Sequence, residues 1–243
     1  TVARVDLVQS LASSAAENRF SRPTFVDDDI LEIHEGRHPV VEAALPKGMF
    51  IPNSVEIGSP ERVVLLTGPN MAGKSTYLRQ AALIVIMAQM GSFVPAEQAC
   101  LGMTDAVYCR VGASDNISRG ESTFLVEMAE TARILRLARP SSLIIMDEIG
   151  RGTGSDDGLA IARAVLKYLI EDVRAKTLFA THFRELTKLE HPDLSNRSMA
   201  VTEQDGDVVF LKTVVDGPAD RSHGIHVARM AGIPRAVSDL AAI

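Results

Sequence analysis

The residues with the clearest chemical meaning form one continuous run from Gly68 to Thr76. The run fits the pattern G-x-x-x-x-G-K-[S/T] of phosphate-binding loops, in which backbone N–H groups turn toward phosphate oxygens. In such a loop Lys74 reaches the β and γ phosphates of a nucleotide, and the Ser75 hydroxyl ligates Mg²⁺. The residues expected to bind the nucleotide are Gly68, Pro69, Asn70, Met71, Ala72, Gly73, Lys74, Ser75 and Thr76.

Two acids, Asp147 and Glu148, end the apolar run Leu143–Met146. In phosphate-loop NTPases a strand of this kind lies beside the loop strand and places its Asp at the metal. We therefore predict that Asp147 holds Mg²⁺ together with Ser75. Glu148 follows directly and is placed to orient or deprotonate an attacking water. The alternative is a strand end with two solvated acids.

Two further segments carry polar groups suited to phosphate. His182 follows the predicted strand Lys176–Ala180, and the carboxyl end of a strand in an α/β sheet faces the ligand crevice. There it would hydrogen-bond the γ-phosphate or the water, whereas the alternative is a surface histidine. The segment Ser118–Thr123 opens a helix, and hydroxyls with free N–H groups at a helix start bind anions. Ser122 is then either a simple N-cap or part of a second anion site, which makes sense if two copies meet head to tail.

The elements that position these residues alternate between apolar runs and helical patterns, which predicts an α/β fold with a mainly parallel sheet. Strands are expected at Ile30–Val41, Val55–Ile57, Val63–Leu66, Ala106–Val111, Ser142–Met146 and Lys176–Ala180. Helices are expected at Val2–Asn18, Thr76–Gln89, Ser122–Ala138, Asp157–Ile170 and Phe183–Leu189. A hairpin of Ser198–Thr202 and Val208–Val214 is predicted around Asp205-Gly206, followed by short helices at Gly224–Ala231 and Arg235–Ala242.

Composition excludes several classes of function. The chain has 243 residues and a formal net charge of -6, which argues against a broad nucleic-acid-binding surface. Cys100 and Cys109 are the only cysteines, and we expect two reduced core thiols of a cytosolic protein. The longest apolar run, near Ala81–Met90, is about half a membrane span, so no membrane association is expected. The first residue is Thr1, which suggests a piece of a longer protein.

Together these motifs resemble the C-terminal ATPase domain of the MutS family of DNA mismatch-repair proteins. The similarity runs from about Leu31 to the end of the chain. The segments that carry it are Thr67–Gln80, Gly91–Ala96, Ser122–Met128, Asp147–Thr153 and Thr181–Phe183. ABC transporter ATPases share this plan but carry a Leu-Ser-Gly-Gly-Gln type of signature, which is absent here.

The resemblance implies a phosphate-loop NTPase of the ABC-ATPase type that converts ATP to ADP and phosphate with Mg²⁺. Its catalytic residues would be Glu148, His182 and Lys74, with Asn70 helping to order phosphate or water. Ser122 would act in trans on the γ-phosphate of a partner copy. Phe50 matches the aromatic that the family stacks on adenine, and its alternative role is a buried core position.

The resemblance also implies three parts: the end of a lever helix at 1–25, the ATPase domain at 26–217 with an antiparallel β part, and a helix-turn-helix at 218–243. Arg229 and Arg235 are the only basic residues of the two C-terminal helices, which favours protein contact over DNA contact. The expected partners are a second copy, through the ATPase face and these helices, mismatched DNA through missing upstream domains, and a MutL-type protein. The expected location is the bacterial cytosol.

Two alternatives stay open. One is another ABC-type ATPase, of a transporter or of chromosome maintenance. The other is a nucleotide-gated dimerisation module with negligible turnover, in which ATP binding would join two copies without a chemical step.

Overall fold

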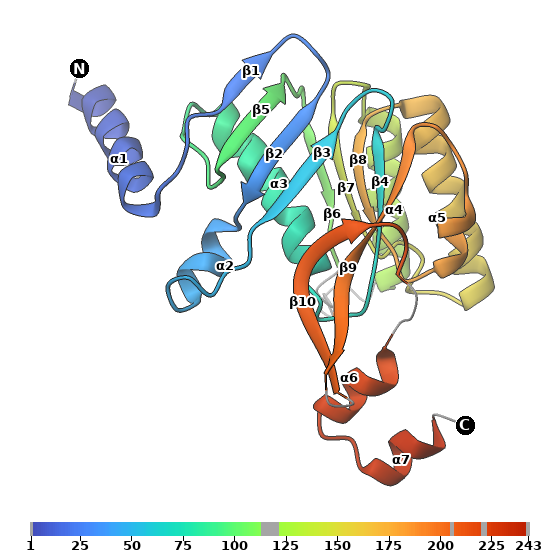
Figure 1. Cartoon of the computed structure of the whole chain (residues 1–243). Helices are drawn as coiled ribbons and strands as arrows, with labels where there is room; N and C mark the ends of the chain where they lie inside the picture. The colour runs from blue at the N-terminus through green and yellow to red at the C-terminus, as the bar shows by residue number, and fades with distance from the viewer. Residues whose placement is uncertain (1, 113–121, 205–206, 220–222, 242–243) are drawn as a thin grey trace.

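Two β-sheets with helices between and outside them form the body of the protein in the computed structural model (Figure 1). The structure describes the whole chain except residues 1, 113–121, 205–206, 220–222 and 242–243. The larger sheet has six strands in the order β10-β9-β4-β8-β7-β6. In that order their bounds are Asp207–Asp216, Leu194–Gln204, Val63–Thr67, Lys176–Ala180, Leu143–Asp147 and Val107–Arg110.

The larger sheet is parallel from β9 to β6, and only β10 runs antiparallel to its neighbour β9. All five residues of β4, of β8 and of β7 are buried. Strands covered on both faces are made of continuous rather than alternating apolar residues, which is why these runs are so plain in the sequence.

The smaller sheet has four strands in the order β1-β5-β2-β3, with bounds Thr24–Val26, Gln98–Gly102, Leu31–Gly36 and Asn53–Ile57. Helix α3 (Lys74–Gln89) lies between the two sheets, and its buried side chains join both of them in one apolar cluster (Figure 1). Helices α4 (Thr123–Leu137) and α5 (Ser155–Tyr168) pack on the other face of the larger sheet. The phosphate loop therefore joins a buried strand to a buried helix.

Shorter elements surround this body. Helix α1 (Val2–Asn18) extends away from the sheets and buries only Ala15 (Figure 1). Helix α2 (Pro39–Ala44) follows β2, a π-helical turn (Leu169–Val173) extends α5, and a 3₁₀ turn (Arg184–Lys188) follows β8. Helices α6 (Gly224–Met230) and α7 (Arg235–Leu240) lie near the end of the β9–β10 hairpin, where the Val208 N–H donates to His226 Nε2.

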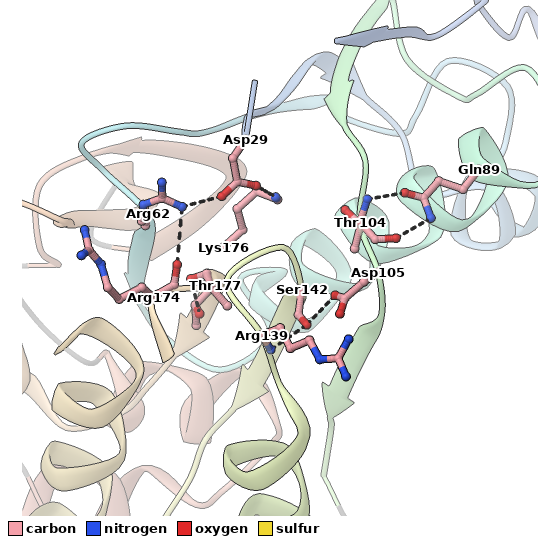
Figure 2. Close-up of polar contacts among 11 residues, drawn as sticks. Asp29, Arg62, Gln89, Thr104, Asp105, Arg139, Ser142, Arg174, Lys176 and Thr177 are labelled. Atoms are coloured by element: carbon pink, nitrogen blue, oxygen red, sulfur yellow. Dashed lines mark hydrogen bonds and ion pairs between the residues drawn. The ribbon is translucent and has the colours of Figure 1, made fainter. Parts of the chain in front are cut away.

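A group of charged side chains joins the two sheets at the edge where β7 and β8 begin. Figure 2 shows Asp29, from the segment between β1 and β2, between Arg62 and Lys176. Lys176 is almost completely buried, and its ammonium group pairs with this carboxylate. Burial alone would raise the pKa of Asp29, but the hydrogen bonds from Lys176 and Arg62 outweigh it and lower the pKa. These contacts hold the smaller sheet to the larger one.

The predicted α/β fold with a parallel sheet and flanking helices is confirmed, and it is compatible with a phosphate-loop ATPase. The prediction of a strand over Ile30–Val41 is wrong beyond Gly36, because Pro39 starts helix α2 there and His38 caps it. The core-thiol prediction is wrong for Cys109, which is exposed on the edge strand β6, and Cys100 is half-buried.

Other predictions have mixed outcomes. Strands β1 and β5 were not predicted, and the helix expected at Phe183–Leu189 is the 3₁₀ turn. Two short C-terminal helices are present, and their helix-turn-helix role and the three domain boundaries stay predictions. Three predicted features lie outside the described residues: the hairpin turn Asp205-Gly206, residues 118–121 of the expected anion site, and Ala242 at the end of the last predicted helix. No helix in the described part of the chain is long and apolar enough to cross a membrane.

Candidate functional site

The carboxyl ends of three neighbouring strands bring the predicted residues to one edge of the sheet. Ala180 on β8 pairs in register with Leu66 on β4 and with Asp147 on β7. The phosphate loop begins two residues after Leu66, His182 lies two residues after Ala180, and Glu148 directly follows Asp147. Segments that lie far apart in the chain therefore meet because the strands are parallel and end together.

The phosphate loop depends on backbone angles that most residues avoid. Gly68 and Gly73 have φ of 136° and 108°, where glycine carries no steric penalty. Gly68 also lies against β9, since an added Cβ would be 3.0 Å from Met199 Cβ. Met71 has φ of 72° although it is not glycine, and such strain persists mainly at functional sites. Ala72 is buried, whereas Asn70 and Met71 are exposed at the top of the loop.

Lys74 closes the loop from inside. Its Nζ donates to the Gly68 carbonyl at 2.6 Å and to Asn70 Oδ1 at 3.3 Å, and it lies 3.6 Å from Glu148 Oε1. The side chain is only 5% exposed. Burial lowers the pKa of Lys74, and the charges of Glu148 and Asp147 oppose that shift. The ammonium group is therefore held at the centre of the loop by weak partners that a phosphate could replace.

Ser75 and Asp147, the two residues predicted to hold Mg²⁺, are in direct contact. The Ser75 hydroxyl donates to Asp147 Oδ2 at 2.7 Å, while Asp147 Oδ1 is buried and has no hydrogen-bond partner among the described residues. Hydroxyl and carboxylate oxygens are the ligands that Mg²⁺ prefers, and Mg²⁺ usually takes its other ligands from water and phosphate. That fits the described residues, in which no cluster of three or more acid, His or Cys side chains is suited to hold a metal by itself.

Glu148 has an unusual backbone and two cationic neighbours. Its φ is 56°, in the left-handed region, and its N–H donates to the Ala180 carbonyl at 3.0 Å. Its carboxylate faces Lys74 on one side, and Arg151 donates to Oε2 at 2.6 Å on the other. The sequence reasoning did not assign Arg151 a role, although it lies in the segment that resembles the family. The strained backbone turns this carboxylate toward the loop rather than continuing the strand.

His182 lies at the end of β8 with its ring 4.0 Å from that of Phe183. Partial burial lowers the pKa of His182, and the positive charges of Arg151 and Lys74 act in the same direction, while Glu148 opposes them. His182 also lines a pocket with Gly68, Pro69 and Asn70, which is closed on the far side by Gly224 and Val227 of α6. His182 is therefore an exposed side chain that borders the loop.

A second pocket opens on the other side of the loop. Phe50 is half-buried and lines it together with Met71, Gly73 and Thr76 of the loop and helix α3. Its position rules out the alternative of a buried core phenylalanine and leaves its ring beside the loop. Apolar side chains of Val41, Leu45 and Ile51 also line this pocket.

Lys212 lines the same pocket and was not predicted. It stands at a bulge of β10 with φ of 56°, where the register with β9 shifts between Phe210 and Val214. The side chain of Asn53 holds this bulge, because it donates to the Lys212 carbonyl at 2.8 Å and accepts from the Val214 N–H at 2.7 Å. Bulges often re-aim a side chain beside a site, but the pairing that creates one is not visible in a strand pattern.

Ser122 is the predicted site residue that stays apart from the others. It is exposed at the N-cap position of α4, and in the described part of the chain its side chain makes no capping hydrogen bond. No hydrogen bond or ion pair among the described residues joins it to the phosphate loop. Its assignment to the γ-phosphate of a second copy therefore stays a prediction.

At the carboxyl edge of a helix-covered parallel sheet, a glycine-rich loop joins a strand to a helix, and acids end a neighbouring strand. This arrangement is compatible with the phosphate-loop ATPases as a class. The sequence model described as MutS domain V matches residues 64–242. The chain belongs to this family, which confirms the prediction made from its motifs.

Similar proteins support the same assignment. A protein named DNA mismatch repair protein MutS from Treponema pallidum is 56% identical over 241 residues, which cover 97% of this chain and 27% of that protein. Proteins of the same name from Rhodopirellula baltica and a Synechococcus strain are each 54% identical, over 99% and 98% of this chain and 27% of each protein. The chain thus spans about a quarter of the length of these relatives.

Proposed function

We propose that this chain binds ATP and hydrolyses it to ADP and phosphate with Mg²⁺. The observation that supports this most strongly is the meeting of Ser75 Oγ and Asp147 Oδ2 at 2.7 Å, beside an Asp147 oxygen that has no partner among the described residues. A buried carboxylate with an unused oxygen is costly unless a cation completes it. Ser75 and Asp147 would hold Mg²⁺, which when bound supplies positive charge to the phosphate oxygens.

The other residues would act on the substrate directly. Lys74 would leave the Gly68 carbonyl and Asn70 to bind the β and γ phosphates, and the loop N–H groups would bind the remaining phosphate oxygens. Glu148 would accept a proton from the attacking water while the water oxygen adds to the γ-phosphorus. The bond between the γ-phosphorus and the oxygen that bridges it to the β-phosphate would break, and ADP would leave. His182 would hydrogen-bond the γ-phosphate or the water, and Phe50 would stack on adenine, with Lys212 at the rim of the same pocket.

The role of the whole protein follows from its relatives and is part of the proposal. Proteins that share this chain are named DNA mismatch repair proteins. We infer that ATP binding closes two copies across the ATPase face, with Ser122 of each at the other's γ-phosphate and the C-terminal helices supporting the dimer. Mismatched DNA would be bound by parts of the protein outside this chain, a MutL-type protein would respond to the ATP state, and the protein would work in the cytosol.

Three measurements on the same sample test this proposal. Equilibrium titration with a fluorescent ATP analogue, with and without Mg²⁺, should give saturable binding, and phosphate release should show Mg²⁺-dependent turnover. Sedimentation with ATP, with ADP and without nucleotide should show a dimer only with ATP. Binding and dimerisation without phosphate release would instead identify a nucleotide-gated dimerisation module. Folded protein without saturable binding would overturn the proposal.

Phe50→Ala is expected to weaken ATP binding by about tenfold, because stacking of a base on an aromatic ring contributes about 1–3 kcal/mol. Phe50 is half-buried at the pocket rim, so the loss of the ring should leave the fold intact. The dissociation constants of ATP and of inorganic triphosphate, measured by competition against the fluorescent analogue, check this. ATP should lose affinity while triphosphate, which has no base, should bind as in the wild type.

The control for this prediction is Phe25→Ala, which removes an exposed ring from β1 in the smaller sheet. It should leave both affinities unchanged. If Phe50→Ala weakened triphosphate as much as ATP, the ring would be supporting the loop rather than binding the base.

The rate of hydrolysis is expected to fall as the pH is lowered, and the midpoint of this fall should lie below the ordinary pKa of histidine because His182 is responsible for it. Because burial lowers the pKa of His182, the neutral ring persists from pH 8 to below about 6.5 and is lost only as the pH falls through the lowered value. The pH profile of kcat/KM checks this, since it reports the pKa values of the free protein. His182→Asn should remove this acid limb, whereas His191→Asn, at the turn before β9, should leave the profile unchanged.

A further inference from the structure

Helix α4 is joined to the loop that carries Glu148 at two points. Glu127 on α4 accepts a hydrogen bond from the Gly150 N–H through Oε1 at 2.6 Å, and the Glu127 side chain is only 6% exposed. Phe124, near the start of the same helix, lies against Gly152, where an added Cβ would be 3.0 Å from the Phe124 Cβ. The first turns of α4 therefore pack directly on residues 150–152.

The same loop is held tightly on its other sides. The Glu148 N–H donates to the Ala180 carbonyl, and Gly150 has φ of 87° and approaches α5 so closely that an added Cβ would be 2.4 Å from the Gly158 carbonyl oxygen. Because these contacts leave little freedom between residues 148 and 150, a shift at the Gly150 N–H moves the backbone of Glu148 as well.

A buried arginine lies against the other oxygen of Glu127. Arg110, at the end of β6, is 4% exposed, and its guanidinium lies 3.5 Å from Glu127 Oε2 and 3.1 Å from Glu130 Oε2. One oxygen of Glu127 thus faces a cation while the other accepts from Gly150. A buried carboxylate whose two oxygens both have partners keeps one rotamer, and it ties β6, α4 and the acid loop together.

We propose that Glu127 is a positioning residue that carries the position of the start of α4 to the carboxylate of Glu148. This inference rests on the proposed function. Ser122 and Glu127 are five residues apart, about 7.5 Å along one helix axis, so α4 transmits a shift at Ser122 to Glu127 as a rigid unit. A phosphate bound at Ser122 would then adjust the position of the Glu148 carboxylate of the same chain.

Three variants of this chain test the proposal. Glu127→Ala removes the bond to Gly150, Glu127→Gln keeps an oxygen that accepts from the same N–H, and Glu130→Ala removes the second carboxylate beside Arg110 without touching the loop. We expect Glu127→Ala to lower kcat about 100-fold, the order that a small misplacement of a catalytic group costs, with the ATP dissociation constant within about twofold. Glu127→Gln should recover most of the rate, and Glu130→Ala should stay within about threefold of wild type.

Hydrogen exchange at residues 148–152, measured without nucleotide, provides a readout that does not depend on hydrolysis. Exchange should be faster in Glu127→Ala than in wild type and in Glu130→Ala. The proposal is overturned if Glu127→Ala changes neither the exchange rate nor kcat, or only one of them. It is also overturned if both Glu127 variants lose ATP affinity as much as they lose rate, because that result would indicate a purely structural role. If the wild-type protein did not hydrolyse ATP, the proposed function itself would be contradicted. Hydrogen exchange in Glu127→Ala would still show whether Glu127 holds the loop.

Discussion

Glu148→Gln is expected to lower the rate of ATP hydrolysis by about 10²- to 10⁴-fold, the contribution typical of a positioned general base. Glutamine has the shape of glutamate but no basic carboxylate, so the variant keeps the packing at the end of β7 and loses the proton acceptor and its negative charge. ATP binding should persist or tighten, because Lys74 loses the carboxylate that lies 3.6 Å from its Nζ and becomes freer to bind phosphate. Single-turnover phosphate release and equilibrium ATP binding measure the two effects separately.

The backbone of Glu148 supports this assignment. A non-glycine residue at φ of 56° costs free energy, and here the N–H bond to Ala180 and the ion pair with Arg151 hold it in place. Glu185→Gln is the matched control, since Glu185 also influences the pKa of His182 but follows β8 on the 3₁₀ turn. It should hydrolyse ATP at the wild-type rate. Wild-type turnover in folded Glu148→Gln, or loss of ATP binding in it, would remove Glu148 from the catalytic role.

The fold was predictable where burial leaves a mark on the local sequence. β4, β7 and β8 are buried on both faces, and each contains a run of consecutive apolar residues. β1 is three residues long with two of them exposed, and it exists only because it pairs with β5, more than seventy residues later in the chain. Pairing across that distance leaves no periodic pattern in the local sequence, so neither β1 nor β5 was predicted.

The site was predictable where one short segment carries the chemistry. Lys74 and Ser75 belong to the loop pattern, and Asp147 was identified because it ends an apolar strand. Lys212 and Glu127 act through geometry instead: a bulge held by Asn53 brings Lys212 to the Phe50 pocket, and the packing of α4 on the sheet brings Glu127 to Gly150. Their residue types are ordinary for a strand and a helix, and only the assembled fold distinguishes them.

Lys74→Met is expected to abolish tight ATP binding while leaving the fold at least as stable as the wild type. Removing a buried charge that pairs with a charged partner costs about 2–5 kcal/mol of binding free energy, so the dissociation constant should rise at least about 30-fold. Titration with the fluorescent ATP analogue in the presence of Mg²⁺ measures this. Lys188→Met, an exposed lysine on the 3₁₀ turn after β8, makes the same chemical change away from the loop and should bind ATP as the wild type does.

The stability of Lys74→Met separates loss of binding from loss of fold. Because burial lowers the pKa of Lys74, the unfolded chain holds this proton more tightly than the folded one, and the charged lysine opposes folding at every pH below its lowered pKa. Methionine has similar length and no charge, so its Tm at pH 7 should equal or exceed that of the wild type. A folded Lys74→Met protein that bound ATP within threefold of wild type would mean that the ammonium group at the centre of the loop is not the phosphate ligand.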